Sequence, residues 1–562
     1  MKLSLPIIAL LITCAARGAD ANAPLGSAAY QPSPERPVGW RGDGTGRYPA
    51  ATPPTTWGRT KNGNTYATKN ILWMAPMPDW GVGCPIIVGQ RIFITTEIYD
   101  LVCLDKQTGR VLWIRSNPEF EGITDADLQA FPVHAKFFSE AKPGLAKLSA
   151  DLTKANAELV EALNAEIATS TTAPFKVPAA ATKKRAIDKK IYDDLQAIDK
   201  KAAEELTKVE ETTATDKKPD DTKKPAAKKP EKLFERYWGQ GVFGFSGQTP
   251  ASDGKNVCAF FTTGVSACYD LDGNRKWIHR GKGGGSEHGN FASPLLAGNT
   301  FVVWANEMRG YDVTTGKLLW NNPAKGYNTY GSMFRVKAGN DLVAAFQWGF
   351  FTRIRDGKPI WDQGIFGDSV QTPIVEGNVI FAHVGYPKNN NEKIGFRAFK
   401  IPDSTDSGKL TQLHTFSSEW GENELVVVKE KNPFDRGFVA SPLFVDGLIY
   451  QITQGAGLLV NDAATGTLVY RKVLPLKPKT HYWDWAGTSA SPTLAGKYIH
   501  LMDNQGTTLV IQPGREYKEI ASNLIEESKD GKSQVQNVST PIFEGTRMYY
   551  RTPGYLYCIG EK

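Results

Sequence analysis

The sequence lacks the cysteine spacings of metal and haem sites. Its 562 residues include six cysteines, no two of them adjacent, and none stands in a CxxC or CxxCH spacing. We therefore expect no zinc site and no c-type haem. An odd cysteine count after the N-terminus also argues against a disulfide framework. Cys258 and Cys268 flank a predicted hairpin turn near Thr263, and they could face each other across two strands or be small buried core residues.

Long apolar runs are also missing beyond the N-terminus. No stretch of eighteen apolar residues follows the first twelve, which argues against an integral membrane protein. Met1 and Lys2 precede the apolar run Leu3–Ile12, a pattern that predicts a secretory signal peptide over residues 1–23. We expect a periplasmic or secreted protein. Lipoprotein anchoring at Cys14 is not expected, because Thr13 fits the position before a lipidated cysteine poorly.

An excess of positive charge spread along the whole chain is absent. The net charge is +7, but residues 216–232 alone hold seven Lys against four acidic residues. A local excess of this kind is weak support for a nucleic-acid surface, so we expect no nucleic-acid partner.

A repeated element is present instead. It consists of a small residue, usually followed by Pro, then apolar residues and a Gly before a β-rich run. Its eight copies begin at Cys84, Thr249, Ser293, Ser332, Thr372, Ser441, Ser491 and Thr540. Most neighbouring copies lie 39 to 50 residues apart, which is the length of a four-stranded propeller blade.

A second element follows most copies of the first. It runs from an Asp through a Thr-Gly or Asp-Gly turn to an aromatic residue, as in Cys103–Trp113, Tyr311–Trp320 and Asn461–Tyr470. This pattern predicts a strand, a tight turn and a second strand whose terminal aromatic packs between neighbouring sheets. The eighth unit stops before its last strand, and the segment Asn70–Trp73 could supply it. The sequence therefore predicts an all-β fold, an eight-bladed β-propeller closed by an N-terminal strand.

The second element resembles the repeat of the PQQ-binding-like β-propeller family. That family includes quinoprotein alcohol dehydrogenases and BamB-type barrel-assembly lipoproteins, and the resemblance covers residues 70–117 and 237–562. The segment Trp40–Gly46 is similar to the Trp-Arg-Gly leader of secreted propellers of this kind. The resemblance implies the fold, but the repeat motif shapes the blade and says little about chemistry.

Residues 119–236 interrupt the propeller, which we expect to span 70–118 and 237–562 after a leader over 24–69. Apolar residues at helical spacing predict two amphipathic helices, followed by a Lys/Pro tract that we expect to be disordered. The hairpin leaves the first blade after its last strand. We expect it to rise from the face that bears the inter-blade loops, as a lid or docking arm or as a tolerated surface insertion. If it is a tolerated insertion, a short linker could replace it with little loss of stability.

Polar and aromatic residues precede the first strands of the blades, at the predicted mouth of the central channel. They are Trp80, Glu287, His288, Tyr330, Asp368, Arg436, Trp483, Asp484 and Trp485. Such a ring could bind a planar or sugar-like ligand, or its members could satisfy one another around a water-filled channel. The sequence has no Ser/His/Asp nucleophile signature and no phosphate-binding or calcium loop.

We expect an exported binding or scaffold protein that acts as a monomer. Its channel mouth or helical insertion would contact other envelope proteins or a small ligand. One alternative is a quinoprotein alcohol or sugar oxidoreductase with PQQ and calcium. In that case Trp483 or Trp485 would stack on the quinone and Asp484 or Asp368 would act as general base. The adjacent cysteines that typically cap the quinone are absent, which disfavours the enzyme. A carbohydrate-binding propeller is the other alternative.

Overall fold

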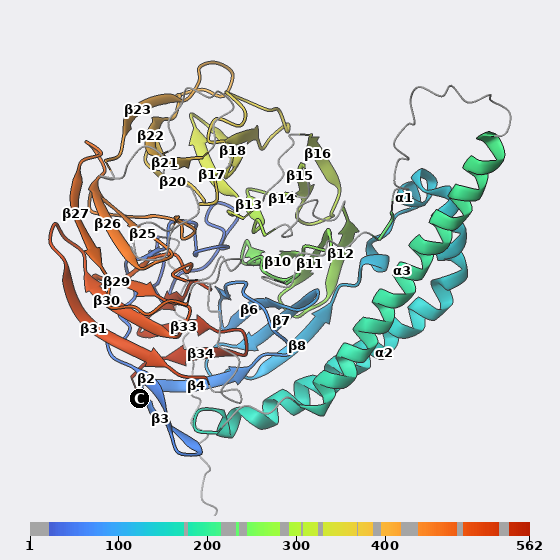
Figure 1. Ribbon diagram of the computed structural model, residues 1–562, viewed down its shortest axis with the longest axis horizontal. Helices are drawn as coiled ribbons and strands as arrows, with labels where there is room; N and C mark the ends of the chain where they lie inside the picture. Colours follow the sequence, from blue (N-terminus) through green and yellow to red (C-terminus); the bar gives the residue numbers. More distant parts are fainter. Residues whose placement is uncertain are drawn as a thin grey trace, which may run out of the picture.

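The computed structural model describes twelve parts of the chain. They are residues 22–173, 178–214, 232–234, 244–281, 291–304, 307–323, 330–367, 369–385, 395–417, 437–479, 487–527 and 539–561. Small sheets are arranged around a common centre, and two long helices run along the outside (Figure 1). The chain is thus a β-propeller, as the repeats predict. In the described residues no helix is both long and apolar enough to cross a bilayer.

The first four sheets follow one another along the chain. The first contains β5 (Ile86–Val88), β6 (Arg91–Thr96), β7 (Asp100–Asp105) and β8 (Val111–Ser116); the second β9 (Ala251–Ser252), β10 (Asn256–Phe260), β11 (Val265–Asp270) and β12 (Arg275–Arg280). The third contains β13 (Leu295–Ala297), β14 (Thr300–Trp304), β15 (Met308–Asp312) and β16 (Leu318–Asn322); the fourth β17 (Phe334–Ala338), β18 (Asp341–Phe346) and β19 (Phe350–Arg353). All pairs within these sheets are antiparallel neighbours in sequence.

Of the remaining four sheets, the last two recruit strands from the N-terminal part of the chain. The fifth contains β20 (Ile374–Glu376), β21 (Val379–Val384), β22 (Gly395–Lys400) and β23 (Thr411–Thr415); the sixth β24 (Leu443–Val445), β25 (Leu448–Ile452), β26 (Gly457–Asp462) and β27 (Leu468–Val473). The seventh joins β28 (Thr493–Ala495), β29 (Tyr498–Met502), β30 (Thr507–Gln512) and β31 (Lys518–Ile525) to β1 (Arg47–Tyr48), β2 (Gly58–Asn62) and β3 (Thr65–Lys69). The eighth combines β32 (Ile542–Glu544), β33 (Arg547–Arg551) and β34 (Tyr555–Ile559) with β4 (Ile71–Pro76).

The Asp-Thr-Gly motif forms the turn between the third and fourth strands of a sheet. In the first sheet Asp105 accepts hydrogen bonds from the Thr108 backbone N–H at 2.8 Å and from its hydroxyl at 2.6 Å. Gly109 then adopts a φ of +73°, which glycine tolerates without the strain that a Cβ would add. The same contacts recur at Asp312 and Thr315 in the third sheet. The motif is therefore explained by turn geometry.

The terminal tryptophan of one sheet packs on the turn glycine of the next. A Cβ on Gly109 would lie 2.5 Å from the Trp73 ring. The same contact recurs between Gly273 and Trp113, between Gly316 and Trp277, and between Gly357 and Trp320. The terminal aromatic thus packs between sheets, as predicted, and any larger turn residue would displace it.

Strand β4 from the N-terminal part of the chain pairs with the C-terminal strand β34. Trp73 lies opposite Cys558, and both side chains are buried in one core cluster. Strand β4 therefore overlaps Asn70–Trp73, the segment that the sequence predicted would complete the eighth sheet. Cys258 and Cys268 also lie opposite each other on β10 and β11, where they form a disulfide.

The segment between β8 and the second sheet contains η1 (Glu119–Gly122), α1 (Asp125–Ala130), α2 (Pro132–Ser170) and α3 (Ala179–Ala214). Helix α2 contacts β8 and β4, the outer strands of the first and eighth sheets (Figure 1). Leu159 and Leu163 are fully buried in the cluster that also contains Trp73. The expectation that this hairpin rises from the loop face is wrong, because its apolar stripe is buried against the rim.

Polar side chains fix the two helices in place. The Asn164 amide donates to the Val111 carbonyl at 2.9 Å and accepts from its N–H at 2.8 Å, as a neighbouring strand would. On α3, the buried Lys184 ammonium lies 2.8 Å from Asp100 of β7 and 2.7 Å from Asp188. Burial raises the pKa of Asp100 to about 6, and the Lys184 charge opposes this rise. Removing one partner would leave a buried charge without compensation, so the cluster specifies how α3 docks.

The edge contact of β4 yields a first prediction. Trp73→Ala should lower the free energy of unfolding by about 3–5 kcal/mol, because it empties a buried site between the eighth and first sheets. Lys69→Ala, an exposed change in the adjoining strand, should stay within about 0.5 kcal/mol of the parent. Denaturant unfolding followed by tryptophan fluorescence measures both. Equal stability of the two variants would contradict the packing described here.

The docking of α2 yields a second prediction. Leu159→Ala should cost about 2–5 kcal/mol, because the side chain is fully buried against the rim. Lys154→Ala on the exposed face of the same helix is the matched control, with an expected change of less than about 0.5 kcal/mol. If thermal and denaturant unfolding give the parent's stability for Leu159→Ala, the helical segment is the dispensable insertion that the sequence allowed.

Candidate functional site

The residues that open the eight repeats surround the centre of the propeller. In seven of the eight, the backbone N–H donates to the side chain of the corresponding residue in the next sheet. The bonds run from Cys84 to Thr249 (3.2 Å), Thr249 to Ser293 (3.0 Å), Ser332 to Thr372 (2.7 Å), Thr372 to Ser441 (3.0 Å), Ser441 to Ser491 (3.0 Å), Ser491 to Thr540 (3.2 Å) and Thr540 to Cys84 Sγ (3.3 Å). Between Ser293 and the fourth sheet, the Met333 N–H donates to the Ser293 carbonyl instead. We call these eight side chains the central ring.

A cavity of about 130 Å³ lies within the central ring. Its other walls come mainly from residues two positions before ring members, namely Val82, Gly247, Phe291, Tyr330, Val370, Val439 and Ser489. Trp40, from the N-terminal leader, also lines it. None of its described lining residues is acidic. The part of the cavity wall that the structure describes is therefore rich in hydroxyl groups and has no carboxylate.

The leader places a cation beside this cavity. Arg41 is fully buried and donates to the Pro442 carbonyl at 2.9 Å and to the Pro492 carbonyl at 2.6 Å. These prolines directly follow two members of the central ring. Its guanidinium carbon lies 5.3 Å from the centre of the Trp40 ring, and burial lowers the arginine's pKa to about 10. The Trp-Arg-Gly segment thus inserts into the channel and cross-links the sixth and seventh sheets.

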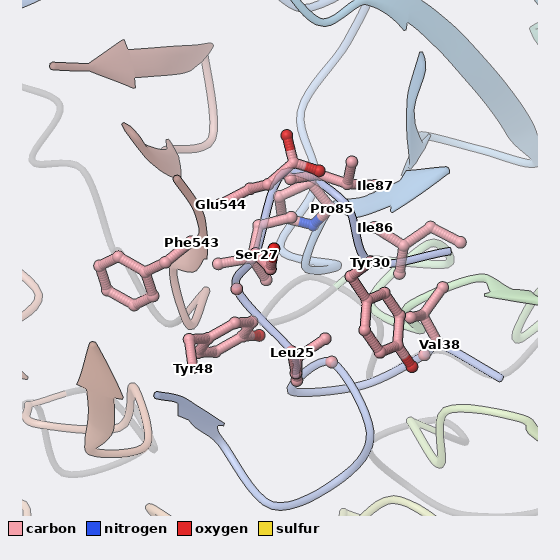
Figure 2. A pocket seen from close by; sticks show the side chains of 14 residues that line it. Leu25, Ser27, Tyr30, Val38, Tyr48, Pro85, Ile86, Ile87, Phe543 and Glu544 are labelled. Atoms are coloured by element: carbon pink, nitrogen blue, oxygen red, sulfur yellow. The ribbon is translucent and has the colours of Figure 1, made fainter. Parts of the chain in front are cut away.

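The rest of the leader lies across the first turns of several sheets. Between it and the first and eighth sheets lies a cavity of about 30 Å³, with Leu25, Tyr30 and Tyr48 on the leader side (Figure 2). Tyr48 makes an edge-on contact with Phe543, with ring centres 5.3 Å apart. A space of this size holds about one water molecule, so the leader is closely packed.

Two of the predicted mouth residues fall within the described chain. Tyr330 lines the central cavity. Trp80 does not line it: the Trp80 carbonyl accepts from the Glu97 N–H, and its ring lies against Gly244. The other seven (Glu287, His288, Asp368, Arg436, Trp483, Asp484 and Trp485) lie outside the described residues.

Two further charged groups lie where the first sheet meets its neighbours: Glu97, partly buried after β6, and Arg551, fully buried on β33. The Glu97 carboxylate accepts from the Phe245 N–H at 2.8 Å and from the Ser246 hydroxyl at 2.6 Å, and burial raises its pKa to about 7. Arg551 donates to the Thr95 carbonyl at 2.6 Å, and burial lowers its pKa to about 9. Both side chains hold neighbouring sheets together. Neither could be selected from the sequence, because no motif distinguishes them from surface charges.

Within the described residues, the space at the centre of the propeller is smaller than a typical ligand pocket. Ligand pockets usually measure about 300–1,000 Å³, whereas the central cavity offers about 130 Å³. Both terminal nitrogens of Arg41, a cation beside the cavity, already donate to carbonyl groups. Within the described residues no group of three His, Cys, Asp or Glu side chains is arranged to hold a metal ion.

A larger cleft lies at the rim, between α2 and the first two sheets. Its volume is about 920 Å³. Leu112 on β8, 45% exposed, lies on one side and Thr153 of α2 on the other. Two arginines and two glutamates also line the cleft, and Arg275 pairs with Glu121. The cleft therefore combines apolar surface with balanced charge. The sequence did not indicate it, because it depends on where the helices dock.

Comparisons with known proteins agree with the repeat pattern. A family model described as "Outer membrane protein assembly factor BamB" matches residues 235–346, which is less than half of the chain. No curated protein matches the sequence.

Solved structures with a similar arrangement are distant. BamB from Moraxella catarrhalis has 13% identity and a TM-score of 0.39, with 55% of this chain and 81% of that chain covered. The C-terminal WD40 domain of Sif2 has 11% identity and a TM-score of 0.36, covering 55% and 79%. Sqt1 from Saccharomyces cerevisiae has 9% identity and a TM-score of 0.38, covering 55% and 82%. The repeat motif and its turn geometry identify this chain as a β-propeller, and a BamB-type family model matches its residues 235–346.

Proposed function

We propose that this protein is an exported, eight-bladed scaffold that binds a segment of another protein at the rim cleft. The N-terminal signal-like segment supports export, and a family model named for an outer-membrane assembly factor matches part of the chain. Pairing of β4 with β34 supports a closed ring of eight blades. The partner is an envelope protein, and the scaffold itself is a monomer.

The relative size of the two cavities carries this proposal. The central cavity of about 130 Å³ is partly occupied by the leader, while the rim cleft is about seven times larger at about 920 Å³. A small-molecule enzyme with this fold would be expected to keep room at its centre for cofactor and substrate. Here the space lies at the rim, where the helical segment adds a second wall.

The chemistry of the cleft favours an extended polypeptide. Its floor, β8, is the outermost strand of the first sheet, and an outer strand can pair with an added strand. At Val111 the Asn164 amide already makes the two bonds that a neighbouring strand would make. Exposed Leu112 offers apolar contact, and the paired Arg275 and Glu121 leave little net charge. A neutral chain with alternating donors and acceptors matches this lining better than an ion does.

Filling the cleft should abolish binding. Peptides selected from a displayed random library against the full chain should bind Thr153→Trp at least tenfold more weakly than the parent, because the indole would occupy the cleft. Lys154→Trp is the matched control, since Lys154 is exposed on the same helix and does not line the cleft. Fluorescence anisotropy of labelled peptides measures the affinities. Equal affinity for both variants, or no selected peptide, would contradict the proposal.

Titration with PQQ and calcium distinguishes the enzymatic alternative from the scaffold proposal. Micromolar binding with dye reduction by alcohols or aldoses would replace the scaffold with a quinoprotein oxidoreductase, provided that Asp484→Asn or Trp485→Ala abolishes turnover. Sugar binding without turnover would favour the carbohydrate-binding alternative. We expect neither.

A further inference from the structure

The hydroxyl protons of the central ring have no acceptor in the described chain. Each ring Ser or Thr is at least 94% buried, and apart from Ser332 each accepts a backbone N–H through its side-chain oxygen. A hydroxyl group carries one proton to donate as well as two lone pairs. None of these seven hydroxyls (Thr249, Ser293, Ser332, Thr372, Ser441, Ser491 and Thr540) donates to a described protein atom, and all seven line the same cavity.

Two buried cations beside the ring form no ion pair with a carboxylate of the described residues. Arg41 and Arg551 are fully buried, and neither forms an ion pair in the described part of the chain. Each also keeps a buried nitrogen without a hydrogen bond, Nε in Arg41 and both Nε and Nη2 in Arg551. A buried positive charge is costly unless an opposite charge lies nearby. No acidic residue is among the described residues that line the cavity, so no described carboxylate offsets these charges inside it.

We propose that the central cavity binds one small oxyanion, of the size and chemistry of sulfate or phosphate. Seven converging O–H donors match the several acceptor atoms of an oxyanion, and the charge of the anion offsets Arg41. The volume of about 130 Å³ is several times the ~30 Å³ that a water molecule occupies in the liquid. The site is independent of the rim cleft, so the scaffold proposal and this one can fail separately.

Equilibrium dialysis of the full-length protein against radiolabelled sulfate tests the site. We expect saturable binding of one sulfate per chain at constant ionic strength, with phosphate competing. Thr372→Val removes one donor and should weaken binding at least tenfold. The matched control is Thr352→Val, which also removes a fully buried hydroxyl that accepts a hydrogen bond, here from Asn322, but lies outside the cavity. Its affinity should equal that of the parent.

The location of the anion is tested on the parent protein, so the result does not depend on whether a variant folds. Anomalous scattering from selenate in crystals of the full chain should give one peak inside the central ring. Three results would overturn the proposal: no saturable sulfate binding, equal affinity in Thr372→Val and Thr352→Val, or a selenate peak elsewhere. Binding of chloride without sulfate would overturn the oxyanion assignment.

Discussion

One hydrogen bond, repeated around the centre, determines how the sheets meet. A backbone N–H at the start of each innermost strand needs an acceptor, and in seven of the eight sheets the side chain of the corresponding residue in the next sheet provides it. A side chain that is short and carries an acceptor is required, which explains why Ser, Thr or Cys precedes the proline in seven of the eight repeats. Because Thr540 donates to Cys84, the last sheet is tied to the first by the same contact. An unpaired buried N–H would cost about 1–3 kcal/mol at each position.

Away from the centre, contacts between sheets rely on packing. Each terminal tryptophan packs against a turn glycine of the next sheet, so the Asp-Thr-Gly motif serves both the turn and its neighbour. Helix α2 then buries Leu159 and Leu163 across the outer strands of the first and eighth sheets. These two sheets contain the two ends of the propeller, and the helix spans the seam where β4 and β34 pair. The leader acts similarly at the centre, where Arg41 joins the sixth and seventh sheets.

Much of this architecture could be predicted from the sequence because it is repeated. Eight copies of a short motif indicate sheets of similar size, and the truncated last copy indicates that Asn70–Trp73 supplies a strand. Placement of the helices could not be predicted, since helical periodicity shows that one face is buried but not against which surface. The sequence showed Arg41 only as part of a leader motif. Its insertion into the channel could not be predicted, because it depends on contacts with Pro442 and Pro492, which lie 401 and 451 residues further along the chain. Of the predicted mouth residues in the described chain, Tyr330 reaches the cavity and Trp80 does not, because loop paths are not repeated.

Substitution at Ser441 tests the central ring most directly. This side chain accepts the Thr372 N–H, and its own N–H donates to Ser491. Ser441→Ala leaves a buried donor unpaired, whereas Ser441→Thr keeps the acceptor. In denaturant unfolding, the account predicts that Ser441→Ala lowers the free energy of unfolding by about 1–3 kcal/mol while Ser441→Thr retains most of it. Parent-like stability of Ser441→Ala would contradict the claim that these hydrogen bonds hold the sheets together.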